Sequence, residues 1–244
     1  MNVAIFGGTF DPIHRGHLAL AQAARERFHL GRIYFVPADI PPHKQKHPLS
    51  SYYDRYAMVS LATAEEKAFA PSLIEAPGTA GSGRPNYSLE TVRKFRAGLK
   101  RSDRLFFLIG MDAFLDIGKW YRAEDLLQEV EFIVGSRPGF SLAKVESALP
   151  EALRLKVPAG SVDRGGSDGG KLAFGRVAIY LLPEVAVKVS ATQVRAAAAL
   201  GAPLKRMVPE EVAGYIQKTG LYQAGDKPSG GKKASGKRAR VRRK

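Results

Sequence analysis

The residue types best suited to catalysis lie near the start of the chain, in the string Gly-Gly-Thr-Phe-Asp-Pro-Ile-His-Arg-Gly-His at positions 7–17. His14 and His17 are three residues apart, so both side chains can face the same point at the entrance of a helix. Imidazoles there can donate hydrogen bonds to phosphoryl oxygens and, when protonated, offset charge that grows in a transition state. The alternative, two surface histidines beside an ordinary turn, explains less of the string. We predict that His14 and His17 are catalytic.

The same string has the features of a phosphate-binding turn. The apolar segment Asn2–Phe6 before it is typical of a buried parallel strand, and a helical pattern follows. Gly7 and Gly8 allow the main chain to approach a ligand closely, and the N–H groups of a helix start attract anions. We predict that Gly7, Gly8, Thr9 and Phe10 bind phosphate. The spacing excludes a Walker A loop and the G-x-G-x-x-G dinucleotide motif.

A second candidate anion site lies late in the chain. Ser190 and Gln193 have the spacing of a capping box, which predicts a helix that starts at Ala191. Thr192 and Arg195 would then lie in its first turn beside exposed N–H groups, an arrangement suited to the terminal phosphates of ATP. A structural cap with a solvated arginine explains this segment equally well.

The elements that must position these residues alternate between strands and helices. Strands are predicted over Asn2–Phe6, Arg32–Pro37, Ser72–Ala76, Leu105–Ile109, Glu131–Val134 and Arg176–Leu182, and helices over Gly16–Phe28, Tyr53–Glu66, Ser88–Leu99, Ala191–Leu200 and Pro209–Thr219. This alternation predicts an α/β fold, with a Rossmann-like, doubly wound parallel sheet in a single domain.

Length and composition set limits on the class of protein. The chain has 244 residues, 45% of them hydrophobic, and no cysteine, which suits one α/β domain with an extra segment. The lack of cysteine excludes a disulfide scaffold, a thiolate zinc site and a cysteine nucleophile. The sequence has no apolar run of about 18 residues and no basic n-region at its start, so we expect a soluble, cytoplasmic protein without a membrane span or signal peptide.

The positive charge is concentrated at the C-terminus. The formal net charge is +15, and residues 224–244 carry nine Lys or Arg and one Asp, leaving +7 on residues 1–223. We predict a catalytic domain over 1–223 and a disordered basic tail over 224–244 that makes weak contact with nucleic acid or anionic surfaces. A solvated tail with no specific partner is the alternative. The Gly-rich segment 164–170 is predicted to be a surface loop without a chemical role.

Several segments together carry a family resemblance. The string at 7–17 resembles the T/H-x-G-H signature of the nucleotidyltransferase superfamily. Residues 36–44 resemble V-P-x-x-x-P-P-H-K, residues 84–91 resemble S-Y-T/S-x-D/E-T, and residues 189–195 resemble I-S-S/A-T-x-I-R. These segments, with Ile109–Asp112, Trp120-Tyr121 and Arg137–Gly139 in the same order, are similar to those of bacterial nicotinate mononucleotide adenylyltransferases. The resemblance covers about Met1–Gln223.

The resemblance implies an activity and its cofactor. The family transfers the adenylyl group of ATP to nicotinate mononucleotide in NAD biosynthesis, which gives nicotinate adenine dinucleotide and pyrophosphate. His14 and His17 would then act at the α-phosphate. The triphosphate would be held by four residues: Lys44, Ser190, Thr192 and Arg195. Mg²⁺ would bind mainly through ATP phosphates, and no protein ligand is predicted for it.

The resemblance also implies which residues bind the mononucleotide. They are Asn86, Tyr87, Ser88, Asp112, Trp120, Tyr121 and Arg137. The Trp-Tyr pair would clamp the pyridine ring, although packing is the default role of such residues. The aspartate would bind a ribose hydroxyl and the arginine a phosphate. Main-chain N–H groups around 86–88, with the Tyr121 hydroxyl, would donate hydrogen bonds to the nicotinate carboxylate.

Other functions remain as alternatives. Within the same class they are adenylyl transfer to nicotinamide mononucleotide or phosphopantetheine, and cytidylyl transfer; the middle and late motifs argue against the last two. From other classes they are a nucleic-acid-binding protein that works through its tail, and an inactive nucleotide-binding module. The sequence makes no prediction of oligomeric state.

Overall fold

The computed structural model describes most of the chain before residue 224. The described residues are 1–40, 49–79, 84–136, 142–158, 160–163, 170–182 and 187–223. Four of the predictions concern residues outside these ranges. They are the roles of Lys44 and Arg137, the surface loop at 164–170, of which only residue 170 is described, and the tail at 224–244. These four, and with them the predicted domain boundary, stay predictions.

An eight-stranded sheet forms the centre of the described fold, in the order β3-β2-β1-β4-β5-β8-β7-β6. The strands are β1 (Asn2–Gly8), β2 (Leu30–Pro37), β3 (Phe69–Pro71), β4 (Arg104–Gly110), β5 (Glu131–Gly135), β6 (Val162–Asp163), β7 (Lys171–Phe174) and β8 (Val177–Leu182). The six strands from β3 to β8 in this order pair in parallel. The strand order reverses beside β1, as in Rossmann-like folds, so the predicted doubly wound parallel sheet is confirmed.

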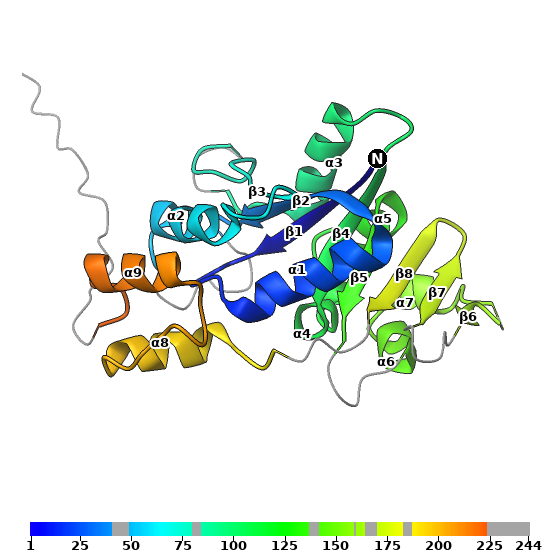
Figure 1. The fold of residues 1–244 in the computed structure, drawn as a ribbon. Helices are drawn as coiled ribbons and strands as arrows, with labels where there is room; N and C mark the ends of the chain where they lie inside the picture. The colour runs from blue at the N-terminus through cyan, green and yellow to red at the C-terminus, as the bar shows by residue number, and fades with distance from the viewer. Residues whose placement is uncertain are drawn as a thin grey trace, which may run out of the picture.

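Helices cover both faces of this sheet (Figure 1). They are α1 (Arg15–Phe28), α2 (Tyr52–Thr63), α3 (Ser88–Gly98), α4 (Met111–Phe114), the 3₁₀ helix η1 (Ile117–Lys119), α5 (Ala123–Glu129), α6 (Leu142–Ser147), α7 (Glu151–Arg154), α8 (Ala191–Ala199) and α9 (Glu210–Thr219). One apolar core lies between the sheet and α3, α4, α5, α6 and α7. The other lies between the sheet and α1, α2, α8 and α9. None of the described helices is long and apolar enough to cross a membrane.

The central strands β1, β4 and β5 are apolar after their first residue, because their side chains pack into both cores. In β1, Val3 and Ile5 belong to the first core, and Ala4 and Phe6 belong to the second. Successive side chains of a strand point to opposite faces, so a strand covered on both sides has no solvent-facing positions. This burial continues along β1 to Phe6, immediately before Gly7, where the candidate site begins.

The structure corrects one predicted strand. Ser72–Ala76 is not a strand; the neighbour of β2 is Phe69–Pro71, and Ala76 N–H donates to the carbonyl of Leu73 in a turn. Phe69 packs into the second core, and this burial selects the earlier segment for pairing. The predicted helix over Tyr53–Glu66 is also too long, since α2 ends at Thr63.

A second difference lies at the far edge of the sheet. β7 pairs antiparallel with β8, and β6 pairs antiparallel with β7. These strands of two and four residues carry too few positions for a clear alternating pattern, so the sequence did not reveal them. They extend the sheet away from the candidate site.

Candidate active site

A cavity of about 1120 Å³ opens at the carboxyl ends of β1 and β4. These two strands flank the point where the strand order reverses, which is where open α/β sheets bind ligands. The volume slightly exceeds the ~300–1,000 Å³ of most pockets for one small ligand. Twelve of the residues predicted from sequence line it: Gly7, Gly8, Thr9, His14, His17, Asn86, Tyr87, Ser88, Asp112, Trp120, Tyr121 and Ser190.

The glycine turn lets the main chain pass close to the ring of Phe10. A Cβ atom added to Gly8 would lie 2.9 Å from the ring of Phe10, closer than real Cβ contacts. Phe10 adopts a φ of 50° and its side chain is buried in the second core. Phe10 is not among the residues that line the cavity, so the phosphate contact predicted for it stays a prediction.

The two histidines lie together at the start of α1. Their rings stack with centroids 3.6 Å apart and an interplanar angle of 20°. His14 is the N-cap of the helix, and its main-chain N–H donates to Nδ1 of His17 at 3.2 Å. Because Nδ1 accepts this bond, the proton of a neutral His17 ring resides on Nε2, which makes Nε2 a hydrogen-bond donor.

Rigid neighbours hold the His17 ring in place. The rings of Phe6 and Phe10 approach it edge-on at 5.9 and 5.1 Å. Gly16 separates the two histidines in the chain, and a Cβ atom there would lie 3.1 Å from Nδ1 of His14 and 3.3 Å from the carbonyl of Val189. The glycine therefore allows α1 to start against the 187–189 segment with both imidazoles at the cavity wall.

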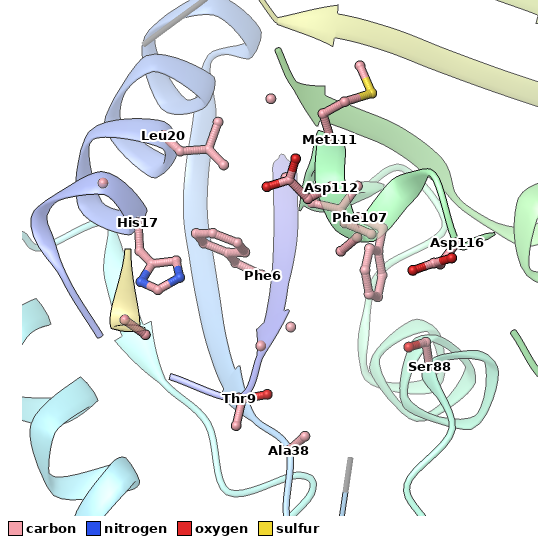
Figure 2. Close-up of a pocket in the computed structure, with 18 of the residues that line it drawn as sticks. Phe6, Thr9, His17, Leu20, Ala38, Ser88, Phe107, Met111, Asp112 and Asp116 are labelled. Atoms are coloured by element: carbon pink, nitrogen blue, oxygen red, sulfur yellow. The ribbon is translucent and has the colours of Figure 1, made fainter. Parts of the chain in front are cut away.

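Polar and aromatic side chains form the opposite wall of the cavity. Figure 2 shows His17 and Phe6 on one side, and Asp112, Asp116 and Ser88 on the other. The second group comes from the ends of β4 and α4 and from the start of α3. The cavity thus has a cationic or donor side on α1 and an acidic side beyond β4.

The aromatic pair of the predicted pyridine clamp lies on this second wall. Trp120 packs against the first core, and its ring meets Phe107 edge-on at 6.2 Å. Tyr121 is 49% exposed and stacks on Tyr87, with centroids 4.3 Å apart. Trp120 therefore combines a packing role with a cavity face, and Tyr121 links the two predicted segments at 86–88 and 120–121.

The second predicted anion site lies at the start of α8. The capping box is confirmed: Ser190 Oγ accepts from the N–H of Gln193, and Gln193 Oε1 accepts from the N–H of Ser190 at 2.9 Å. Ser190 lines the cavity, whereas Thr192 and Arg195 do not. Arg195 donates from Nη1 to the carbonyl of Asp11 at 2.6 Å and from Nη2 to Oγ1 of Thr192 at 3.3 Å.

Arg55 is a structural centre of the site that the sequence analysis missed. Its side chain is 1% exposed, and it donates to the carbonyls of Thr9 at 2.8 Å, Ala38 at 2.7 Å and Ser50 at 3.1 Å. Burial lowers the pKa of Arg55. Its position three residues before Met58, on the apolar face of a helix, was the signal available in the sequence.

Glu75 is a second missed residue, buried at the wall of the cavity. The Thr91 hydroxyl donates to its Oε1 at 2.5 Å. Burial raises the pKa of Glu75 from 4.5 to about 7, while the Thr91 hydrogen bond and Lys94 act in the opposite direction. The sequence analysis had assigned 72–76 to a strand, so it did not consider Glu75 as a site residue. In the structure this segment is a turn, and the Glu75 side chain lines the cavity.

Comparisons with known proteins agree with this geometry. The family model described as cytidylyltransferase-like matches residues 5–197. A Geobacter sulfurreducens protein named "Probable nicotinate-nucleotide adenylyltransferase" is 36% identical over 225 residues, which cover 91% of this chain and 98% of the relative. A Moorella thermoacetica protein of the same name is 38% identical over 221 residues, 91% of each chain.

A solved structure shares the fold. The Plasmodium falciparum nicotinic acid mononucleotide adenylyltransferase complexed with NaAD has a TM-score of 0.62 and 19% sequence identity, with 91% of this chain and 97% of that chain covered. At this identity the likeness concerns the fold alone. With the family model matching most of the chain and the relatives matching nearly all of the described fold, the chain belongs to the cytidylyltransferase-like family and, within it, to the nicotinate-nucleotide adenylyltransferases.

Proposed function

We propose that this protein transfers the adenylyl group of ATP to nicotinate mononucleotide and releases pyrophosphate. The observation that carries the proposal is the stacked pair His14 and His17 at the glycine turn, inside a cavity large enough for two nucleotides. The names of the relatives, at 36 and 38% identity over nearly the whole domain, support this choice of acceptor.

The reaction requires alignment more than a protein nucleophile. The phosphate of the mononucleotide is ionised at neutral pH, and one of its oxygens attacks the α-phosphorus of ATP. The bond from that phosphorus to the bridging oxygen breaks, and pyrophosphate leaves with the electron pair. His17, through Nε2–H, and His14 would donate to the α-phosphoryl oxygens as their charge grows.

The phosphate groups would be held on both sides of these histidines. Gly7, Gly8, Thr9 and the main chain of Phe10 are proposed to bind phosphate at the end of β1. The triphosphate end would lie against Ser190 and the N-terminal part of α8, which carries Thr192 and Arg195. Lys44, outside the described residues, is proposed to contribute a further cation.

The mononucleotide would occupy the wall beyond β4. Trp120 and Tyr121 would stack on the pyridine ring, and Asp112 would bind a ribose hydroxyl. The main chain at 86–88 and the Tyr121 hydroxyl would receive the pyridine carboxylate. Arg137, which lies outside the described residues, is proposed to hold a phosphate.

Mg²⁺ is proposed as the cofactor, carried by the ATP phosphates. Carboxylate oxygens are the protein groups that suit this ion, and Asp112 and Asp116 place such oxygens in the cavity wall. When bound, the ion would neutralise phosphate charge. Asp116 already forms a salt bridge, with its Oδ1 2.5 Å from Nζ of Lys119, so we do not assign it a direct bond to the ion.

Pyrophosphate release with ATP and Mg²⁺ tests the proposal across a panel of acceptors. Nicotinate mononucleotide should give the highest kcat/KM, with nicotinamide mononucleotide and phosphopantetheine far below it. CTP in place of ATP tests the cytidylyl alternative suggested by the description of the family model. The proposal would be refuted if none of the mononucleotides in the panel supported pyrophosphate release, or if the enzyme preferred CTP to ATP.

Two finer assignments belong to the same proposal. We place the enzyme in the cytoplasm, where ATP and pyridine mononucleotides are available. We also propose that residues 224–244, which lie outside the described residues, make only weak, salt-sensitive contact with polyanions. Neither assignment affects the chemistry of the cavity.

A further inference from the structure

A buried aspartate connects the histidine loop, defined as Thr9–His14, to the end of the described chain. Asp11 is 5% exposed. Its Oδ1 accepts a hydrogen bond from the hydroxyl of Tyr222 at 2.6 Å, and its Oδ2 lies 3.4 Å from the N–H of Ser50. Residues 11 and 222 are therefore joined although they lie at opposite ends of the domain sequence.

The turn after α9 brings Tyr222 to this position. Gly220 adopts a φ of 72° at the C-cap, and Leu221 N–H returns to the carbonyl of Ile216 at 3.2 Å. Tyr222 itself has a φ of 67°, a conformation that L-residues with side chains rarely adopt. Such strain persists where surrounding contacts over-determine it, and the bond to Asp11 is such a contact.

The histidine loop depends on side chains from outside it. None of its residues is part of a helix or strand. Arg55 holds the carbonyl of Thr9 at 2.8 Å, and Arg195 holds the carbonyl of Asp11 at 2.6 Å. Two groups reach the side chain of Asp11 rather than its main chain: the N–H of Ser50, at 3.4 Å, and the hydroxyl of Tyr222, which makes the shorter bond at 2.6 Å.

We propose that Tyr222 is a positioning residue, which acts through Asp11 to fix the histidine loop and so the place of His14 and His17. The loop ends at His14, whose N–H in turn orients the His17 ring at 3.2 Å. A displacement of the loop would therefore move both imidazoles together. Errors of about 1 Å in such groups can cost on the order of 10²-fold in rate without loss of substrate binding.

The chain contains a matched control for this bond. Tyr215 on α9 donates from its hydroxyl to Oδ1 of Asp54 on α2 at 2.8 Å. This bond also joins a tyrosine hydroxyl near the end of the described chain to an aspartate carboxylate, but it connects two helices and does not involve the histidine loop. Tyr222→Phe and Tyr215→Phe each remove one hydroxyl and keep the ring.

The kinetic test compares the two variants with the wild type. We expect Tyr222→Phe to lower kcat by about 10-fold, with KM for both substrates within about 3-fold, because position and not binding is disturbed. Tyr215→Phe should keep kcat within about 2-fold, although its thermal stability should fall as much as that of Tyr222→Phe. Equal losses of kcat in the two variants, or none in Tyr222→Phe, would overturn the proposal.

A second test does not depend on the reaction. The kinetic test rests on the proposed function, whereas the imidazole NMR signals of His14 and His17 report their surroundings directly. Both signals should shift in Tyr222→Phe and stay in place in Tyr215→Phe. Unchanged histidine signals in Tyr222→Phe would reject the positioning role, even if no acceptor in the enzymatic panel were turned over.

Discussion

The smallest functional unit of the site is a pair of imidazoles, ring against ring. The ring centroids of His14 and His17 lie 3.6 Å apart, with an interplanar angle of 20°. The hydrogen bond from His14 N–H to Nδ1 of His17 selects the tautomer that donates from Nε2. His17 is thus preorganised as a neutral donor, which lowers the cost of reorganisation during the reaction.

Replacement of either histidine tests this role. His17→Ala and His14→Ala should each lower kcat by roughly 10²–10³-fold, the usual value of one preorganised donor to developing charge. His29 is an exposed histidine at the C-cap of α1 with a φ of 49°, so His29→Asn keeps that conformation and serves as the control. Steady-state kinetics that show near-normal kcat for His17→Ala or His14→Ala would refute the assignment of that residue.

Glu75 predicts a pH dependence of stability. Because burial raises its pKa from 4.5 to about 7, the folded protein binds this proton more tightly than the unfolded chain. Its contribution is complete below pH 4.5 and is lost as pH rises to about 7, on the order of 3 kcal/mol in all. Glu75→Gln should therefore gain stability relative to the wild type at pH 8 but not at pH 4.5.

Urea unfolding of the wild type and Glu75→Gln at both pH values measures this difference. The Thr91 hydroxyl, which donates to Oε1 in the wild type, can donate equally to the amide oxygen that the substitution introduces. The hydrogen bond is therefore conserved, and only the titration is removed. A difference in unfolding free energy that is the same at pH 4.5 and pH 8 would show that Glu75 does not change its protonation in this range.

At the scale of the elements, α2 acts as a support for the phosphate turn. It presents Arg55 on its buried face, between the end of β1, the end of β2 and the segment that enters α2 itself. A planar guanidinium can serve several carbonyls at fixed angles, which an ammonium group cannot. The element that holds the site together therefore contributes no residue to the cavity lining.

Arg55→Lys should accordingly destabilise the protein although the charge is kept. We expect a loss of about 2–4 kcal/mol, because at least two buried carbonyls lose their donor. Arg93, whose exposed guanidinium pairs with Glu129, provides the control, and Arg93→Lys should have little effect. Denaturant unfolding measures both variants, and an unchanged midpoint for Arg55→Lys would contradict this account.

The wall beyond β4 predicts the choice of pyridine. The acid and amide forms have nearly the same shape, so discrimination depends on hydrogen bonds and charge. We expect kcat/KM to favour nicotinate mononucleotide by at least about 10²-fold, or roughly 2.7 kcal/mol. Trp120→Ala should weaken use of both forms, and Tyr121→Phe should reduce the preference. Equal use of the amide by the wild type would refute this specificity but not adenylyl transfer.

In the complete fold, the last described residues pack against the histidine loop. Tyr222 and Arg195, the latter on α8, both form hydrogen bonds to Asp11. Figure 1 shows α8 and α9 beside α1 and α2. The site is therefore complete only when the last helix has packed. We therefore expect residues up to Tyr222 to be required for activity and the residues after Gln223 to be dispensable.

Two truncations test that boundary. A chain that ends at Gln223 loses nine basic residues and one acidic residue but keeps every described residue of the two cores, so its kcat should match the full chain. Its weak binding to RNA should be lower and should decrease steeply with salt in both proteins. A chain that ends at Gly220 should lose most of its kcat. Loss of turnover on truncation at Gln223 would assign the tail a structural role.

The features that depend on local order in the chain could be predicted from residue patterns alone. The apolar run of β1, the glycine turn, the spacing of His14 and His17, and the capping box at Ser190 are all patterns within a few residues, and each is found in the structure. The parallel α/β sheet also follows from the alternation of such patterns. Such patterns and the family resemblance together indicated twelve of the residues that line the cavity.

The polar network that joins distant segments became visible only in the folded structure. Arg55 bonds to carbonyls 5, 17 and 46 residues away, and Tyr222 bonds to Asp11 across 211 residues. Burial likewise selected Phe69–Pro71 over Ser72–Ala76 as β3 and placed Glu75 in the cavity wall. Local sequence patterns carry no record of such pairings, because desolvation and hydrogen bonding between remote groups arise only when the whole chain has packed.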